Sequence, residues 1–382
     1  MIDHKHKRLS PAYGFDDISI APGTFTINPD QTDTKLIINN HQLEIPIIAS
    51  AMDAIVSPSF AVDLGTIGGL AVLNLEGVQS RYSQPQEAID RIIKASPKEI
   101  IPIFQDIYSH PINDNLIGDR ISEIKSQGVI CSVSVTPANT KRLSPLAIEA
   151  GADILFVQST VTTARHESKS LKGLVFSELL KTTNIPVIVG NCVSYETTLE
   201  LMETGIDGIL VGVGPGAACT TREVTGVGVP QVTATLDCSS ARDEFHRRTG
   251  KYVPIITDGG IRNGGDLCKA IASGADGVMI GTPFAQSNEA PGGGYNWGMA
   301  SPHPALPRGT RIEVGVKASL KEILFGPSSI TNGTMNLVGA LKACMGMVGA
   351  YTIQDMHRTN LVLAPSIKTE GKHLQRTGHG AP

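Results

Sequence analysis

The sequence lacks the marks of several classes of protein. Its six cysteines are spread along 382 residues without a CxxC pair or a His/Cys cluster at zinc spacing, so neither a disulfide scaffold nor a zinc centre is indicated. The ten histidines form no triad and no metal-binding pattern. The 32 basic and 36 acidic residues give a net charge of −4 without a clustered basic face, which disfavours nucleic acid as a partner.

Long apolar segments are also missing. No run is long enough to cross a bilayer, and the polar residues 1–15 contain no apolar core of a signal peptide. We therefore expect a cytoplasmic protein with reduced thiols and no membrane partner. The chain does have the length and the apolar content, 41%, for one large core, and we predict a single catalytic domain over residues 1–382.

Short β-branched runs recur along the chain and alternate with helical patterns. Buried strands separated by helices are typical of parallel β/α architecture, and eight such units fit a closed barrel better than an open sheet. The predicted fold is therefore α/β, a (β/α)8 TIM barrel. The expected barrel strands are residues 45–52, 69–74, 129–135, 154–159, 186–192, 208–213, 254–258 and 278–282.

The connection 75–128 is the longest between expected strands. It carries helical patterns at 86–94 and 116–126, and we expect one further strand at 101–106, outside the barrel. This span is too short for a second globular domain. Two later segments also leave the repeat. Residues 283–312 are rich in Gly, Pro, Ser and His, which is typical of an active-site flap, and residues 366–382 form a basic tail.

The strongest chemical motif is GVGPGAACTTR, residues 212–222, which follows the sixth expected strand. Loops at the carboxyl ends of barrel strands build the active site. Three glycines and a proline favour a tight loop, and Cys219 follows at its tip, so this thiol is a candidate nucleophile.

A second motif lies at the ends of the seventh and eighth expected strands, DGGIRNGGD and IGTP. Loops at these two positions commonly bind phosphate in barrels. The backbone of Gly259, Gly260, Gly281 and Thr282 is expected to donate to that anion, and the Asp258 carboxylate is suited to ribose hydroxyls. Ser50, Met52 and Asn191 are further candidates, because they also end expected strands.

Together these motifs resemble the IMP dehydrogenase/GMP reductase family. The similarity rests on GVGPGAACTTR, DGGI, SAMD, GNC and NWGMAS, and runs from YGFDDI to LKACMGMVGA. The connection after the second strand lacks the tandem CBS domains that most IMP dehydrogenases insert there, and the flap is short. Both features resemble the small CBS-less branch of cyanobacteria and actinobacteria, and GNCVSYE, GPGAACT and LPRGTRI are most similar to its cyanobacterial side.

The resemblance implies roles for the matched residues. Cys219 matches the nucleophile that attacks purine C2, Thr221 the threonine beside the reacting centre, and Met299 with Ala300 the backbone contacts to the base. With the positional arguments, the predicted substrate-binding residues are Ser50, Met52, Gly216, Asp258, Gly259, Gly260, Gly281, Thr282, Met299 and Ala300. The predicted dinucleotide-binding residues are Gln158, Ser159, Asn191, Gly212 and Gly214.

A monovalent cation and an oligomer are implied as well. The carbonyl groups of Gly214, Gly216 and Cys219 match the donors to K⁺, and Glu370 with Gly371 resembles the stretch that completes the site from a neighbouring subunit. We therefore expect a homotetramer or homooctamer.

The sequence departs from the family pattern at several positions. Ala218 stands where the family has a phosphate-binding serine, Gln158 where it has the aspartate that holds the dinucleotide, and Asn296 where the flap has a tyrosine. The Arg-Tyr dyad that activates water has no counterpart. Arg308 and Arg311 are the basic candidates nearby, and Arg308 stands where relatives have a purine-contacting Glu or Gln.

The predicted function is IMP dehydrogenase, which oxidises IMP to XMP with NAD through a thioimidate on Cys219. GMP reductase, which expels ammonia from GMP and uses NADPH, is the first alternative; the reduction needs a proton donor, and the flap has Arg308 instead of an acid. An FMN-dependent 2-hydroxy-acid oxidase and a non-catalytic purine nucleotide-binding protein are the others. The sequence does not rank NAD above NADP.

Overall fold

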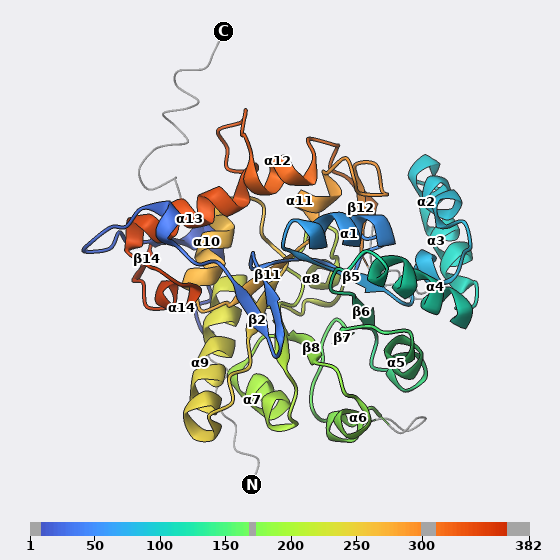
Figure 1. Ribbon diagram of the computed structural model, residues 1–382, viewed down its shortest axis with the longest axis horizontal. Helices are drawn as coiled ribbons and strands as arrows, with labels where there is room; N and C mark the ends of the chain where they lie inside the picture. Colours follow the sequence, from blue (N-terminus) through green and yellow to red (C-terminus); the bar gives the residue numbers. More distant parts are fainter. Residues whose placement is uncertain (1–8, 168–172, 299–310, 365–382) are drawn as a thin grey trace.

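The computed structural model describes residues 9–167, 173–298 and 311–364. Eight parallel strands form a closed barrel, in which β11 pairs with β4 and β10 pairs with β9 (Figure 1). The barrel strands are β4 (Ile47–Ala49), β5 (Leu70–Asn74), β6 (Ser132–Val135), β7 (Ile154–Gln158), β8 (Val187–Cys192), β9 (Gly208–Val211), β10 (Ile255–Asp258) and β11 (Gly277–Ile280). The predicted (β/α)8 barrel is confirmed, and each expected barrel strand overlaps one of these.

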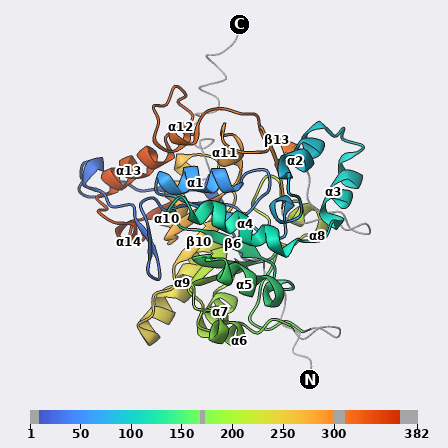
Figure 2. The same ribbon diagram turned by 45° about the vertical axis from the view of Figure 1, so that its right-hand side comes forward.

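Helices follow the strands and surround the barrel, as the two views show (Figures 1 and 2). Their amphipathic faces account for this, since Ile117, Ile121 and Ile124 of one helix are all buried. The helices of the barrel region are α1 (Pro58–Thr66), α2 (Pro85–Lys94), α3 (Ile100–Ser109), α4 (Asp114–Lys125), α5 (Thr140–Glu149), α6 (Phe176–Thr182), α7 (Tyr195–Glu203), α8 (Thr221–Thr225), α9 (Gln231–Thr249), α10 (Gly264–Ala272) and α11 (Thr282–Ala285).

The segment after α11 packs against the barrel rather than forming a separate sheet layer. It contains β12 (Tyr295–Trp297), β13 (Arg311–Glu313), α12 (Leu320–Phe325), α13 (Leu337–Val348), α14 (Ile353–Met356) and β14 (Leu361–Leu363). β12 and β13 pair antiparallel at the base of the expected flap, and β14 pairs antiparallel with β1 (Ile18–Ile20). Short 3-10 turns lie at Phe15–Asp17, Pro29–Gln31 and Val78–Ser80.

The lower end of the barrel interior is apolar. Inward-facing side chains from seven strands form one fully buried cluster, and the hairpin of β2 (Leu36–Ile38) and β3 (His41–Leu43) joins it from below. Leu36, Ile38 and Leu43 of that hairpin are buried, so it closes the amino-terminal end of the barrel. The barrel members of the cluster are Ile48, Leu70, Val72, Ile154, Phe156, Ile188, Leu210, Ile256 and Met279.

The upper end of the interior is polar. The strand alternation that places Val72, Phe156 and Ile256 inside continues to Asn74, Gln158 and Asp258 at the carboxyl ends of the same strands. Reactive groups therefore gather at one mouth of the barrel, which is the position that the fold gives to active sites.

The connection between β5 and β6 holds three helices and one 3-10 turn, with no CBS-type domain. The predicted strand at 101–106 is wrong, because these residues belong to α3. Phe104 and Ile107 are buried at helical spacing, and Pro102 is tolerated because the first turn of a helix needs no backbone donor there. The apolar run 101–106 taken alone is typical of a strand, whereas together with Ile107 and Tyr108 it has the spacing of a helix.

None of the described helices has both the length and the hydropathy that a membrane span requires.

Candidate active site

Cys219 lies on the carboxyl-terminal side of the barrel, in the loop between β9 and α8. Its backbone N–H donates to the Gly216 carbonyl at 3.0 Å, which closes a tight turn. Its thiol is half-buried and donates to Thr221 Oγ1 at 3.2 Å. The turn therefore leaves Cys219 partly exposed, and the hydrogen bond to the threonine at the start of α8 fixes the direction of the thiol.

Arg222 stabilises this loop by hydrogen bonds to the backbone on both sides of it. Its guanidinium donates to the carbonyls of Val213 (3.1 Å) and Val229 (2.6 Å), which precede and follow the Cys219 turn. Gly214 has φ +75°, and a Cβ there would come within 2.6 Å of Arg222 Cγ, so the loop requires glycine at this point. Sequence reasoning missed Arg222, although it ends the GVGPGAACTTR motif.

The Cys219 loop packs directly on the loop that follows β10. A Cβ on Gly259 would lie 3.1 Å from Pro215 Cγ and 3.4 Å from the Gly216 nitrogen, so the two backbones are in contact. A Cβ on Gly260 would lie 3.3 Å from Pro215 Cβ. The two motifs that the sequence singled out therefore form one surface.

Of the two glycines in this loop, Gly259 has a backbone N–H that already donates a hydrogen bond. The N–H of Gly259 donates to the Met279 carbonyl of β11 at 3.1 Å, so it is already used within the barrel. This corrects the expectation that Gly259 donates to a phosphate. The loop itself is held by Arg262, whose side chain binds Asp266 (2.9 Å) and Asp16 (2.7 Å).

Asp258 is the centre of a polar cluster at the barrel mouth. Its Oδ2 accepts from Asn191 Nδ2 at 2.8 Å and from Gln158 Nε2 at 3.1 Å. Removal of the carboxyl group from water raises the pKa of Asp258 to about 6, and the Asn191 hydrogen bond opposes this rise. Gln158 Oε1 is buried and has no hydrogen-bond partner among the described residues.

The neighbouring predicted residues mainly shape this cluster. Ser159 donates its backbone N–H to the Gly190 carbonyl at 2.9 Å, and its hydroxyl bonds the Val161 carbonyl at 2.9 Å. Gly212 approaches β10 so closely that a Cβ would lie 2.4 Å from the Asp258 carbonyl oxygen. Both residues therefore order the backbone under Gln158 and Asp258.

A third group surrounds Gly281, which ends β11. A Cβ on Gly281 would lie 3.3 Å from Met52 Sδ and 3.8 Å from Asn296 Nδ2. Ser50 donates its N–H to the Ile280 carbonyl at 3.0 Å, and Thr282 begins α11 beside it. The loops after β4 and β11 and the strand β12 therefore meet at Gly281. Asn296 is buried, and its Oδ1 has no partner within the described structure.

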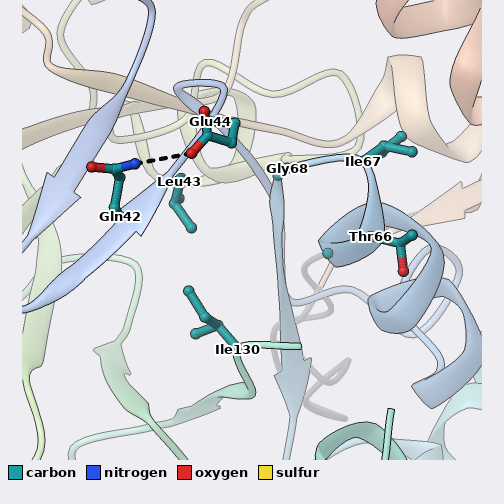
Figure 3. Close-up of a pocket in the computed structure, with 9 residues that line it drawn as sticks. Gln42, Leu43, Glu44, Thr66, Ile67, Gly68 and Ile130 are labelled. Atoms are coloured by element: carbon teal, nitrogen blue, oxygen red, sulfur yellow. Dashed lines mark hydrogen bonds between the residues drawn. The ribbon is translucent and has the colours of Figure 1, made fainter. Parts of the chain in front are cut away.

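In the described part of the chain, a cavity lies near each end of the barrel. One of about 340 Å³ lies at the amino-terminal end, between β3 and the start of β5, where Gln42 donates to Glu44 at 2.9 Å (Figure 3). The other, of about 190 Å³, lies beside the Cys219 loop and is lined by Val161, Val193, Val213 and Val229 among others. The second is lined by residues that follow β8 and β9, so it lies at the same end of the barrel as Cys219 and Asp258. No group of three or more His, Cys, Asp or Glu in the described ranges could hold a metal ion.

Comparison with known proteins decides the family. Residues 12–301 match the model of the IMP dehydrogenase / GMP reductase domain. The chain belongs to the IMP dehydrogenase/GMP reductase family. An uncharacterized oxidoreductase of Mycobacterium leprae is 38% identical over 361 residues, covering 92% of this chain and 96% of the relative. The inosine-5′-monophosphate dehydrogenase of Cryptosporidium parvum is 31% identical over 386 residues, covering 92% and 91%.

A solved structure agrees with this membership. The crystal structure of an IMP dehydrogenase/GMP reductase-like protein from Corynebacterium glutamicum has a TM-score of 0.89 and 34% identity, and the match covers 94% of this chain and 96% of that one. The predicted family is thereby confirmed. The cyanobacterial assignment within the short branch stays a prediction.

Among the residues that the family resemblance suggested, Arg311 packs against the end of α2. Its guanidinium donates to the carbonyls of Ile92, Ile93 (2.8 Å) and Ala95 (2.8 Å) at the end of α2, and its Cζ lies 4.8 Å from the centre of the Tyr295 ring. A cation is favoured there because the last carbonyls of a helix are partly negative. These contacts give Arg311 a structural role at the end of α2, and its expected role in activating water stays a prediction. Met299, Ala300, Arg308, Glu370 and Gly371 lie outside the described residues.

Proposed function

We propose that this member of the family is an IMP dehydrogenase, which oxidises IMP to XMP. The observation that carries the proposal is the direct packing of the Cys219 loop on the Asp258–Gly260 loop, through Pro215 and Gly259. A nucleotide held by ribose and phosphate on one loop would thereby present its base to the thiol on the other. Such fixed geometry is worth up to roughly 7–11 kcal/mol of activation free energy.

The polar mouth of the barrel suits a nucleoside monophosphate. The Asp258 carboxylate accepts hydrogen bonds only, as ribose hydroxyls require, and Asn191 and Gln158 hold it in place. The phosphate is assigned to the backbone of Gly260, Gly281 and Thr282, beside the buried Asn296 amide. Met52 lies against Gly281 and would cover the nucleotide from the β4 side.

In the proposed reaction, Cys219 Sγ forms a bond with purine C2, and the hydrogen on C2 leaves with its electron pair as a hydride. Water then adds to C2, the S–C2 bond breaks, and XMP and the free thiol are released. Thr221 holds the sulfur at the start of this sequence. Arg308 stays the proposed water-activating residue.

We propose that a dinucleotide binds at the other side of the mouth. The unpartnered Gln158 Oε1 and the valine-lined cavity of about 190 Å³ offer a hydrogen-bond acceptor and an apolar surface next to the Cys219 loop. We assign Gln158, Ser159, Asn191, Gly212 and Gly214 to this site. Bound NAD would accept the hydride; the residues of the chain orient it and exclude water.

The K⁺ site and the assembly are proposed on the same footing. Gly216 uses one carbonyl lone pair for the Cys219 N–H, which leaves a second for a cation. Gly214 and Cys219 would contribute the other carbonyls, with Glu370 and Gly371 from a neighbour in a tetramer or octamer. We also propose a cytoplasmic location.

A crossed assay tests the proposed function. The purified protein is incubated with IMP and NAD, with IMP and NADP, and with GMP and NADPH, while nicotinamide absorbance is followed. We expect reduction of the dinucleotide with IMP only. Consumption of NADPH with GMP would establish GMP reductase instead, and binding of IMP without turnover in any pair would identify a nucleotide-binding protein.

A further inference from the structure

A chain of hydrogen bonds connects three elements behind the nucleotide pocket. The Tyr108 hydroxyl of α3 donates to Asp53 Oδ2 at 2.7 Å and accepts from Trp297 Nε1 at 2.9 Å. Asp53 and Trp297 are 3% and 1% exposed. Both bonds are thus shielded from water, and deleting the shared hydroxyl would leave the Trp297 N–H without its acceptor.

Ring packing reinforces this connection. Phe104 lies one helical turn before Tyr108 on α3, and its ring centre is 6.2 Å from that of Trp297 and 6.1 Å from that of Tyr108. The i, i+4 spacing on the helix accounts for the shared face. α3 therefore contacts β12 through two side chains rather than one.

Each end of the chain of hydrogen bonds leads to the candidate pocket. Asp53 follows Met52, whose sulfur lies against Gly281. Trp297 follows Asn296, whose amide lies against the same glycine, and precedes Gly298, where a Cβ would lie 3.6 Å from the Ala218 carbonyl oxygen of the Cys219 loop. A displacement of Trp297 or Asp53 would move residues on two sides of Gly281.

We propose that Tyr108 is a positioning residue for the nucleotide pocket, whose hydroxyl holds β12 and the turn after β4 in register so that Asn296 and Met52 meet at Gly281. The α2–α4 connection, which carries no second domain, thereby becomes part of the active-site support. This proposal rests on the proposed function, because it assumes that a purine nucleotide binds at Gly281.

The variant Tyr108→Phe tests this inference, since it removes only the hydroxyl. We expect the KM and the Kd for the purine nucleotide to rise about tenfold while kcat changes less than about threefold, because the proposed contacts of Asn296 and Met52 are made to the substrate in the ground state. Calorimetric titration with IMP and with GMP gives the Kd independently of turnover.

Trp297 provides a second readout, because it is the single tryptophan of the sequence. Its emission should shift in unliganded Tyr108→Phe, and nucleotide should change the emission of the wild type more than that of the variant. Tyr82→Phe is the matched control: the Tyr82 hydroxyl donates to the Ile107 carbonyl of α3 at 3.1 Å and is not bonded to Trp297. The control should keep wild-type KM and emission.

The outcomes separate the two proposals. Wild-type KM, Kd and emission in folded Tyr108→Phe would overturn the positioning role and leave the proposed function intact. An equal effect of Tyr82→Phe would also overturn it, because the loss would then follow from α3 packing alone. GMP turnover by the wild type would overturn the IMP dehydrogenase assignment only, and the tenfold effect would then be expected with GMP. Failure of the wild type to bind either nucleotide would overturn both.

Discussion

The two ends of the barrel interior are made from the same strands but from different side chains. At the lower end, residues such as Val72, Phe156 and Ile256 are completely buried, and the β2–β3 hairpin covers them. Two positions further along the same strands, Asn74, Gln158 and Asp258 replace them. One end therefore stabilises the fold, and the other bears groups whose burial costs free energy.

Rough magnitudes support this division. Burying a side chain such as Ile or Phe contributes about 1.5–3 kcal/mol. A buried polar atom without a partner costs about 1–3 kcal/mol, and such atoms in the described part of the upper end include Ser134 Oγ, Gln158 Oε1 and Asn296 Oδ1. Substitutions at the lower end should therefore change stability, while those at the upper end should change catalysis and can even stabilise the fold.

The largest effect is expected for Cys219→Ala. Turnover should fall by at least about a thousandfold, because the nucleophile is lost, while the Kd for IMP and the melting temperature change little. Steady-state assays, calorimetric titration and thermal unfolding measure the three quantities. Near-normal XMP formation by this variant would contradict the mechanism, whatever the fold.

Adjacent isoleucines test the lower end. Ile38 is 0% exposed inside the barrel end, and its neighbour Ile37 is 60% exposed on the other face of β2. Ile38→Ala should lower the free energy of unfolding by about 2–5 kcal/mol, and Ile37→Ala by less than about 0.5 kcal/mol. Chemical denaturation provides both values. Equal losses would show that the hairpin does not seal the barrel.

Asp258→Asn tests the opposite behaviour at the upper end. The pKa of the Asp258 carboxyl is about 6 against 3.8 for the free group, so stability falls as the pH rises from about 3.8 and the loss is complete above about 6. The wild type should lose about 2–3 kcal/mol relative to the variant as the pH rises from about 4 to about 7. Denaturation at several pH values measures this loss.

The same substitution should weaken nucleotide binding. We expect the Kd for IMP to rise at least about tenfold at neutral pH, because the ribose hydroxyls lose a charged acceptor. The wild type should also bind less well below about pH 6, as Asp258 becomes protonated. The phosphate of IMP titrates in the same range, so Asp258→Asn is itself the control: the inflection that it abolishes belongs to Asp258. Unchanged inflections in the two proteins would exclude this carboxyl group.

The smallest effect is expected for Arg311→Ala. Loss of the bonds to the last carbonyls of α2 should lower the free energy of unfolding by about 1 kcal/mol and leave the hydrolysis of the Cys219 adduct unchanged. Arg308 lies three positions before Arg311 in the sequence. Arg308→Ala should instead let the adduct accumulate without lowering the free energy of unfolding. Mass spectrometry of the protein mixed with IMP and NAD detects the adduct. Accumulation in Arg311→Ala would support its catalytic role.

Local patterns were sufficient to predict the barrel. Each strand is a short buried run that begins or ends near glycine or proline, and the Cys219, Asp258 and Gly281 motifs all stand where such runs end. Because carboxyl ends of parallel strands meet at one mouth, positions in the sequence predicted proximity in space. The packing of Pro215 on Gly259 agrees with that prediction.

Contacts between distant segments were beyond such reasoning. Nothing near Arg311 in the sequence indicates the end of α2, and nothing near Tyr108 indicates Asp53 or Trp297. The Gly259 N–H appeared available because its acceptor, the Met279 carbonyl, comes from another strand. Each omission concerns a hydrogen bond whose second partner is chosen by the tertiary fold.

The pairing of β1 with β14 has a consequence for synthesis on the ribosome. Ile18 pairs with Leu363, so the first strand of the described chain cannot form this pair until the last strand has been synthesised. Meanwhile the preceding residues can dock earlier, because the Tyr13 carbonyl accepts from Val232 and the Phe15 carbonyl from Lys269. The nascent amino-terminal segment is thus tethered to α9 and α10 first, and its strand edge becomes covered only when translation passes β14.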